Sequence, residues 1–216
     1  MCAVDKIVIA GDNPVSDAFG LEEPIAPVDQ FNFPMRDRPV IRQNPDGQRE
    51  LTEMNWGLVP YWAKEKKVGR MAYNARMESL IEGKPTFREA FKKRKCLLIG
   101  TSYIEHREED GKMVTYEFSV EGGEPYAYAG LWETWKDGFL STAMITTIPN
   151  ELVEIYHDRM PVILRSEDYA TWLDPTSDPV ELLALLQPFP AERMTVQKTT
   201  LPPRTKSSAD QLKLFD

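Results

Sequence analysis

Apolar residues occur along the chain mainly in short runs of the length and alternation typical of β-strands. The predicted strands cover residues 38–42, 48–52, 95–100, 113–120, 126–131, 139–147, 161–164 and 194–198. Between the first two lies Asn44-Pro45-Asp46-Gly47, a sequence typical of a hairpin turn. The pattern therefore predicts a strand-rich fold with at least one tight hairpin.

Helical segments are fewer and shorter than the strands. They are predicted over residues 75–81, 86–93, 151–156, 167–173 and 180–187. The expected N-terminal caps are Thr86, with Glu89 completing a capping box, Asn150, Ser166 and Asp178. Because helices and strands do not alternate regularly, we expect an α+β fold: a single domain with a curved, mostly antiparallel sheet or barrel surrounded by short helices.

The composition is that of a globular protein, with 42% hydrophobic residues in a chain of 216. A chain of this length supports one sizeable core, so we expect one domain over residues 1–200 and a flexible tail over residues 201–216. The first ten residues include Asp5 and Lys6 and do not resemble a signal peptide, and no apolar run is long enough to span a membrane. With only two cysteines, the chain is expected to be cytoplasmic, with reduced thiols.

Metal and cofactor chemistry is not indicated by the sequence. The two histidines, His106 and His157, lie outside any Cys/His cluster, and no glycine-rich phosphate loop occurs. We therefore expect neither a bound metal nor a cofactor.

Charge is distributed unevenly along the chain. The net charge is −8, yet residues 62–95 contain 11 Lys and Arg against 4 acids. Such a segment can form a basic surface that holds phosphates on an otherwise acidic protein. The alternative is that these lysines and arginines are simply the solvated faces of helices.

Cys2 is the first candidate for chemistry. Aminopeptidases remove Met1 before a small residue, and the mature chain would then begin with a 1,2-aminothiol. Its amine has an ordinary pKa of about 8 and its thiol of about 8.5, so both groups have reactive fractions near neutral pH. The amine condenses with an aldehyde to a Schiff base, and the thiol can close a five-membered thiazolidine at a high effective molarity. The alternative is an inert cysteine that happens to follow Met1.

Glu105 and His157 are candidates for the proton transfers of such a reaction. Glu105 follows an apolar strand, where partial burial would raise its pKa toward a working value. His157 lies at a predicted helix end before a strand, where it can contact phosphate or carry a proton. The alternatives are an ordinary glutamate at a strand end and a histidine that caps a helix.

Five segments, taken in order, resemble the motifs of the SRAP family (SOS-response-associated peptidases). They are Trp56-Gly-Leu-Val-Pro-Tyr-Trp-Ala-Lys64, Asn74-Ala-Arg-Met-Glu-Ser79, Phe91–Cys96 with Glu105, Tyr126-Ala-Tyr-Ala-Gly-Leu-Trp-Glu133, and Thr146-Thr147 followed by His157-Asp-Arg-Met-Pro-Val-Ile-Leu164. Cys2 stands where the family has its catalytic cysteine. Any one motif is weak, but five in order are specific.

The resemblance implies a protein of the DNA-damage response that binds single-stranded DNA and crosslinks to abasic sites as a thiazolidine. It implies that Cys2 is the nucleophile, that Asn74 orients the N-terminal residue or the sugar, that Glu105 transfers protons, and that His157 binds the lesion's phosphate or assists ring opening. The residues that match the family's DNA channel are Arg76, Arg159, Trp62, Pro39 and Thr146. A tryptophan there can stack on bases or wedge between them.

The chain departs from the family pattern beside the nucleophile. The family usually begins Met-Cys-Gly-Arg, whereas Ala3 and Val4 follow Cys2 here. Loss of the arginine removes a possible phosphate contact, and the added Cβ restricts close approach of backbone to DNA. The Gly-Phe-Tyr-Glu-Trp segment of the family is Ser102-Tyr-Ile-Glu-His106, in which only the glutamate keeps its place. We expect activity with weaker DNA affinity.

The C-terminal tail carries a separate motif. Its last residues resemble the peptide that docks in the bacterial sliding clamp, through Gln211, Leu212, Leu214 and Phe215. The apolar side chains would fill a pocket while the glutamine anchors by hydrogen bonds. The alternative is a tail that packs on its own domain.

Two other functions remain open from the residues alone. Cys2, His157 and either Glu105 or Asn74 have the residue types of a cysteine peptidase with limited or self-processing activity. Only Met1 precedes Cys2, so self-processing has no longer propeptide to remove. The third possibility is a non-catalytic single-stranded-DNA-binding module in which Cys2 is incidental. In each case we expect a monomer without membrane contact, associated with the nucleoid if it binds DNA.

Overall fold

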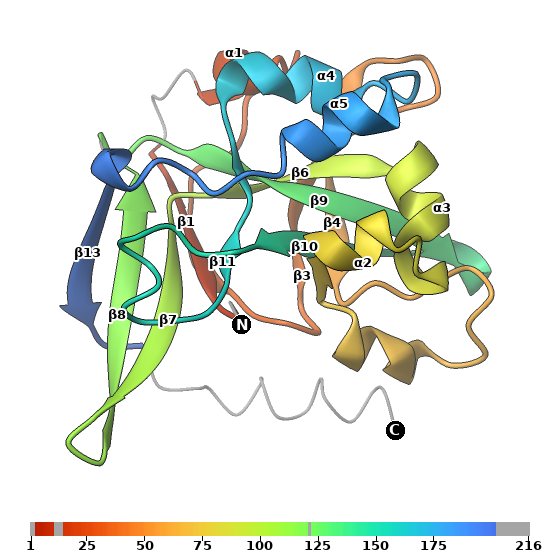
Figure 1. Cartoon of the computed structure of the whole chain (residues 1–216). Coiled ribbons are helices and arrows are strands. Elements are labelled where there is room, and N and C mark those ends of the chain that lie inside the picture. Colours follow the sequence, from red (N-terminus) through yellow and green to blue (C-terminus); the bar gives the residue numbers. More distant parts are fainter. Residues whose placement is uncertain (1–2, 11–14, 121, 202–216) are drawn as a thin grey trace.

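The computed structural model describes residues 3–10, 15–120 and 122–201 (Figure 1). Its strands are β1 (Asp5–Ile9), β2 (Val28–Asn32), β3 (Asp37–Gln43), β4 (Arg49–Trp56), β5 (Asn74–Arg76), β6 (Lys95–Gly100), β7 (Ser102–Glu109), β8 (Lys112–Val120), β9 (Tyr126–Trp135), β10 (Phe139–Thr147), β11 (Met160–Pro161), β12 (Ile163–Leu164) and β13 (Met194–Thr199). Its helices are α1 (Val15–Phe19), α2 (Met77–Ile81), α3 (Pro85–Lys93), α4 (Tyr169–Leu173) and α5 (Pro179–Ala184), with 3-10 turns at Lys66–Met71, Lys136–Gly138, Ser166–Asp168 and Ala191–Arg193.

Five strands close into a barrel. They run in the order β10, β4, β3, β6 and β9, and β9 pairs again with β10. All of these pairs are antiparallel except β4 with β10, where Ser141 lies opposite Asn55. The expected α+β fold with a mostly antiparallel barrel is confirmed. Closure leaves no free edge in this part of the sheet.

A second sheet lies against the barrel in the order β13, β8, β7, β1 and β2. All its strands are antiparallel, and Asp5 of β1 lies opposite Tyr103 of β7. The β7–β8 hairpin extends beyond the body of the molecule (Figure 1). This sheet brings the start of the described chain beside the middle of β7.

The core occupies both faces of the barrel strands. Leu97 and Ile99 of β6 belong to the apolar cluster that includes α1, α3, α4 and α5, which cover the barrel in Figure 1. Cys96 and Leu98 belong to the cluster shared with the second sheet. Every residue of β6 is therefore buried, which explains why its sequence is a nearly continuous apolar run.

The first predicted helix, 75–81, is wrong over its first residues. Asn74–Arg76 form β5, which pairs in parallel with β10, and the helix covers only Met77–Ile81. The next helix begins at Pro85, after Lys84 as cap, and no side chain caps it. The predicted capping box of Thr86 and Glu89 is therefore wrong, because proline occupies the first helical position and already lacks the N–H.

The later helices also differ from the prediction. Residues 151–156 form successive turns rather than a helix, although Asn150 Oδ1 accepts from Val153 N–H at 2.9 Å as a cap does. The segment 167–173 is divided into a 3-10 turn and α4, preceded by Arg165 rather than by a capping Ser166. The last helix ends at Ala184, and Asp178 caps it as predicted, accepting from Val180 N–H.

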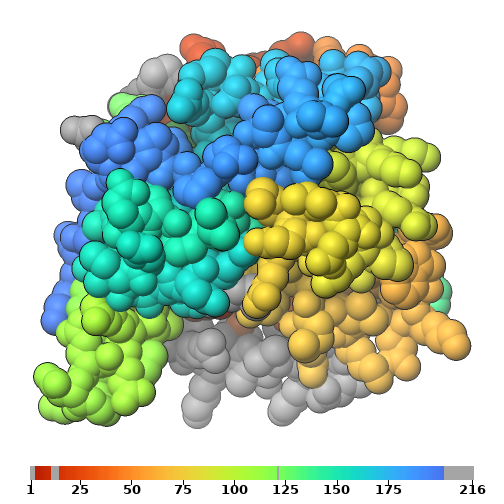
Figure 2. Space-filling view, viewed as in Figure 1, coloured from red at the N-terminus to blue at the C-terminus, as the bar shows by residue number. Residues whose placement is uncertain are grey.

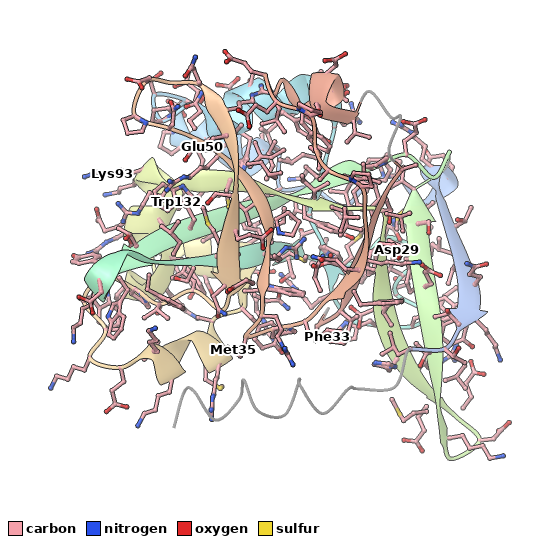
Figure 3. The ribbon with its side chains drawn as sticks, turned by 180° about the vertical axis from the view of Figure 1, so that it is seen from behind. Asp29, Phe33, Met35, Glu50, Lys93 and Trp132 are labelled. Atoms are coloured by element: carbon pink, nitrogen blue, oxygen red, sulfur yellow. The ribbon has the colours of Figure 1, made fainter. Side chains whose placement is uncertain are left out.

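The predicted strands agree well with the structure, with two differences. Residues 161–164 divide into β11, which pairs with β10, and β12, which pairs with β9. The sequence analysis missed β1, β2 and β7. On the rear of the molecule, seen in Figure 3, Arg42 joins the β3–β4 hairpin to β9: it donates to Glu50 at 2.7 Å and lies over the Trp132 ring at 4.4 Å.

Candidate active site

Glu105 lies within β7, opposite Tyr116 of β8, and not after the end of a strand as the sequence suggested. It is 3% exposed, and its Oε1 has no hydrogen-bond partner among the described residues. Burial disfavours the charged carboxylate and raises the pKa of Glu105 to about 8. The side chain can therefore hold or release a proton near neutral pH.

His157 faces Glu105 from the segment between β10 and β11. Turns place it there, with its own N–H donated to Val153 O at 2.9 Å. Its Nε2 is 3.9 Å from Glu105 Oε2, while its Nδ1 accepts the Arg159 backbone N–H at 2.9 Å and lies 3.0 Å from Asp158 Oδ1. Since Nδ1 acts as an acceptor, the neutral ring carries its proton on Nε2, toward Glu105.

The electrostatics of this pair favour two neutral groups. Burial lowers the pKa of His157 below its ordinary value, whereas burial raises that of Glu105. At neutral pH one exchangeable proton lies on each side chain, in a site partly closed to water. Such a pair can deliver a proton to a reacting group and take one back.

Arg159 lies beside the pair and is held within the protein. Its Nη1 and Nη2 donate to the two carboxylate oxygens of Glu78 at 2.7 and 2.9 Å, and Nη2 also donates to Thr146 O at 2.7 Å. Figure 2 shows the segment before β12 lying beside α2 on this face. The guanidinium predicted to contact DNA is thus engaged by a carboxylate.

β5 places Asn74 and Arg76 along the same end of β10. Asn74 lies opposite Met144 and is buried, and Arg76 lies opposite Thr146 and is exposed. Because Arg159 donates to Thr146 O, β10 connects these residues with the loop that carries His157. Glu105 and His157 contact each other directly, whereas Asn74 and Arg76 are connected to His157 only through β10 and Arg159.

The described chain begins beside Glu105. Ile104 N–H donates to Val4 O at 2.9 Å, and Asp5 pairs with Tyr103, so the register continues toward Ala3 opposite Glu105. Cys2 itself lies outside the described residues. Val4 is 6% exposed, so its side chain faces the protein. An arginine at this position would have to be accommodated in a buried environment, which argues against simple loss of a phosphate contact.

The other predicted DNA-channel residues differ in accessibility. Trp62 is 50% exposed, whereas Pro39 in β3 is buried and Thr146 is fully buried. Thr146 Oγ1 has no hydrogen-bond partner in the part of the chain that the structure describes. Only Trp62 and Arg76 of this set present an open side chain. The clamp-like residues Gln211, Leu212, Leu214 and Phe215 lie outside the described residues.

Two networks near the site were missed by sequence reasoning. One joins Glu78 to Arg159; Glu78 belongs to a quoted motif but was given no role. The other is fully buried and joins Asp5 of β1 to Arg38 of β3 and Asn32 of β2. Nothing in the sequence marks either pairing, because the partners are far apart along the chain.

Other reactive or hollow features lie elsewhere. Cys96 is fully buried, and burial raises the pKa of its thiol to about 12, so this cysteine is inert. A surface hollow of about 590 Å³, lined by residues such as Asn150 and Phe189, includes neither Glu105 nor His157. Among residues 3–10, 15–120 and 122–201, no group of three or more metal-ligating side chains occurs. Within the same ranges, no helix is both long and apolar enough to span a membrane.

Similar proteins share both the sequence pattern and the fold. The chain is 37% identical over 176 residues to the abasic site processing protein YoqW of Bacillus subtilis (strain 168), covering 78% of each chain. It is 33% identical over 143 residues to the abasic site processing protein YMR114C of Saccharomyces cerevisiae, covering 62% of this chain and 39% of the yeast protein. A crystal structure of a Bacteroides thetaiotaomicron protein superposes with a TM-score of 0.82 at 26% identity, covering 92% of each chain.

Fold and site together define an α+β barrel protein with a buried glutamate that faces a half-buried histidine, a pair suited to proton transfer. The family model described as SOS response associated peptidase (SRAP) matches residues 8–200. The chain belongs to this family.

Proposed function

We propose that this protein senses abasic sites in single-stranded DNA and shields them by forming a covalent thiazolidine with Cys2, once Met1 has been removed. The observation that carries the proposal is the contact between the buried Glu105 and the half-buried His157, which lie 3.9 Å apart and both favour their uncharged forms. Cys2 is bonded to Ala3, which follows the β1–β7 register to this pair. The relatives named abasic site processing proteins support the same substrate.

The reaction needs two proton transfers that Glu105 and His157 can provide. The Cys2 amine adds to the aldehyde of the ring-opened abasic site to give a carbinolamine. Glu105 protonates the hydroxyl, which leaves as water and gives the iminium ion. The nitrogen proton then returns to the Glu105 carboxylate, which leaves the neutral imine. The thiol sulfur then adds to the imine carbon, and its proton passes to the nitrogen. The sum is aldehyde plus aminothiol giving thiazolidine plus water, with no change in oxidation state.

Binding of the DNA strand is assigned to the two exposed residues among those that match the family's DNA channel. Trp62 offers an aromatic face on which a base can stack, and Arg76 offers a charge for a phosphate. Asn74 begins β5, which Arg76 ends, and we assign to it the orientation of the sugar or of the N-terminal residue. Arg159 would reach a phosphate only by sharing or exchanging the Glu78 carboxylate.

The test is incubation with single-stranded DNA that carries one abasic site. We expect a heat-stable adduct whose mass is that of the mature protein plus DNA less one water. Cys2→Ser should abolish this adduct while leaving binding of intact DNA unchanged, and Cys96→Ala should leave the adduct yield unchanged because that thiol is buried.

Absence of an adduct from the wild-type protein would contradict the proposal. Cleavage of a peptide substrate by Cys2, without adduct, would support the cysteine peptidase instead. Binding of single-stranded DNA with neither reaction would leave the non-catalytic module.

We also propose that residues 211–216 bind the bacterial sliding clamp, on the basis of the sequence Gln211-Leu-Lys-Leu-Phe215 alone. Such an interaction would bring the protein to replicating DNA, where single strands are exposed. Deletion of residues 211–216 should abolish co-elution with the clamp, whereas Ser207→Ala, in the same tail, should not. Retained co-elution after the deletion would contradict this assignment.

A further inference from the structure

Glu78 is a charged residue that contacts the site through Arg159 and has no part in the proposed chemistry. It lies in the first turn of α2, and its carboxylate is 44% exposed. Hydrogen bonds from Arg159 hold its pKa below the ordinary value, so it is ionised at neutral pH. A two-point contact between a carboxylate and a guanidinium fixes both position and orientation.

This contact determines where Arg159 lies. The guanidinium is 9% exposed and is held on one side by Glu78 and on the other by Thr146 O. With its side chain held at both places, the backbone of Arg159 has little freedom to move. The N–H of the same residue is the group that donates to His157 Nδ1 at 2.9 Å.

That hydrogen bond controls the tautomer of His157. While Nδ1 accepts from Arg159 N–H, the ring proton lies on Nε2 and faces Glu105, where it stabilises the carboxylate form after proton transfer. A competing acceptor is present, because Asp158 Oδ1 is 3.0 Å from Nδ1 and the Asp158 side chain is 83% exposed. If Arg159 N–H moved away, Asp158 would favour a proton on Nδ1. The charged groups facing the ring are thus Glu105 from β7 and Asp158 and Arg159 from its own loop.

We propose that Glu78 is a positioning residue that, through Arg159, keeps the His157 proton on Nε2 and so sets the direction of proton exchange with Glu105. The inference rests on the proposed function for its catalytic meaning, but its structural part can be measured without any reaction. In this proposal α2 positions Arg159 through Glu78.

The first experiment reads the tautomer directly. Protein labelled with ¹⁵N-histidine contains only His106 and His157, so the ring nitrogens of both can be resolved by long-range proton–nitrogen correlation. We expect His157 protonated on Nε2 in the wild type and a large share of Nδ1–H in Glu78→Gln. His106, which lies on the exposed side of β7, should be unchanged. An unaltered His157 spectrum in folded Glu78→Gln would overturn the proposal, whatever the activity.

The second experiment measures crosslinking at saturating DNA. Glu78→Gln should slow adduct formation by about ten- to a hundredfold and alter its pH profile, because a small displacement at a reacting pair is costly. Glu82→Gln is the matched control, because it removes the same charge at the C-terminal cap of the same helix, where Glu82 pairs with Lys84 at 3.3 Å. An unchanged rate and profile in Glu78→Gln would contradict the proposal. If the wild type formed no adduct, the proposed function would fail and the tautomer measurement alone would decide the role of Glu78.

Discussion

Two buried carboxylates on adjacent strands of one sheet differ in their hydrogen-bond partners. Asp5 of β1 is 0% exposed and accepts hydrogen bonds from Asn32 and from two nitrogens of Arg38. Glu105 of β7 is 3% exposed, and one of its oxygens has no hydrogen-bond partner among the described residues. They are connected by register, since Asp5 lies opposite Tyr103, two residues before Glu105.

The difference shows how partners decide what a buried charge does. Asp5 ties β1 and β2 to β3, because Arg38 also donates to Ile99 O at 2.9 Å and stacks over Trp56. Burial raises the pKa of Asp5, but Arg38 and Asn32 act against that shift. Among the described residues no donor reaches Glu105 Oε1, and burial is the largest influence on the pKa of Glu105. Asp5 therefore connects the two sheets, whereas Glu105 can take up or release a proton near neutral pH.

The largest expected effect is loss of the paired carboxylate. Asp5→Ala leaves the fully buried Arg38 guanidinium without its counter-ion, which should lower the free energy of unfolding by about 3–5 kcal/mol in urea titrations. Asp29→Ala removes an exposed carboxylate that pairs with Lys6 on the neighbouring strand, and should cause little change. Equal losses in the free energy of unfolding for the two variants would contradict the structural role of the Asp5–Arg38 pair.

The opposite sign is expected for Glu105, which has one oxygen without a hydrogen-bond partner among the described residues. Glu105→Gln replaces a group that resists ionisation with a neutral one of the same shape, which should raise the free energy of unfolding at pH 8 by about 1–3 kcal/mol. The same variant should form the adduct about a hundredfold more slowly, since it cannot transfer a proton. A destabilised Glu105→Gln would mean that Glu105 is held by interactions outside the described residues.

The wild-type protein should show this effect as a dependence on pH. The folded state keeps the Glu105 proton up to about pH 8, whereas the unfolded chain releases it near 4.5, so the folded state binds more protons in between. Stability is therefore lost as pH rises through this window, by at most about 1.4 kcal/mol per pH unit. The difference between wild type and Glu105→Gln at pH 5, 6.5 and 8 isolates the Glu105 contribution. The lowered pKa of His157 acts in the opposite sense, because the folded state then binds fewer protons than the unfolded chain just below the ordinary pKa of histidine. A constant difference across these pH values would contradict the assignment.

The smallest expected effect concerns a neutral group. Thr146→Val removes a fully buried hydroxyl that lacks a hydrogen-bond partner in the described chain, and should raise the free energy of unfolding by about 0.5–1 kcal/mol. Thermal unfolding of this variant beside Thr147→Val, whose hydroxyl contacts the Met77 sulfur, provides the comparison. A loss of stability in Thr146→Val would indicate a partner among the residues outside the described ranges.

Sequence patterning predicted the barrel strands well, and β8 and β13 of the second sheet, but it missed β1, β2 and β7 of that sheet, two of them for a physical reason. β6, β9 and β10 are buried on both faces, so their apolar runs are plain. β1 and β7 contain Asp5 and Glu105 at buried positions, and these charges interrupt the apolar pattern by which strands are recognised. The missed strands are thus the ones that carry the joint and the proposed acid.

The candidate site was named from motif resemblance, but its contacts were not foreseeable. Position in the sequence gives no indication that Glu105 faces His157. Nor does it indicate that Glu78 accepts hydrogen bonds from Arg159, 81 residues further along the chain. Pro39 and Thr146, matched to the DNA channel by motif, are buried, because a strand position fixes which face a side chain takes only once the register is known. Their role in DNA binding stays a prediction, as does the domain boundary at residue 200.

The buried thiol of Cys96 can report the rate at which the barrel opens. It sits in a strand that is covered on both faces, and a thiol reagent can reach it only when those layers separate. The rate at which the Cys96 thiol is modified in native buffer therefore reports how often the barrel strands separate. In the Cys2→Ser variant, which retains Cys96, the modification rate can be compared with and without single-stranded DNA. A lower rate with DNA would show that bound DNA slows opening of the barrel.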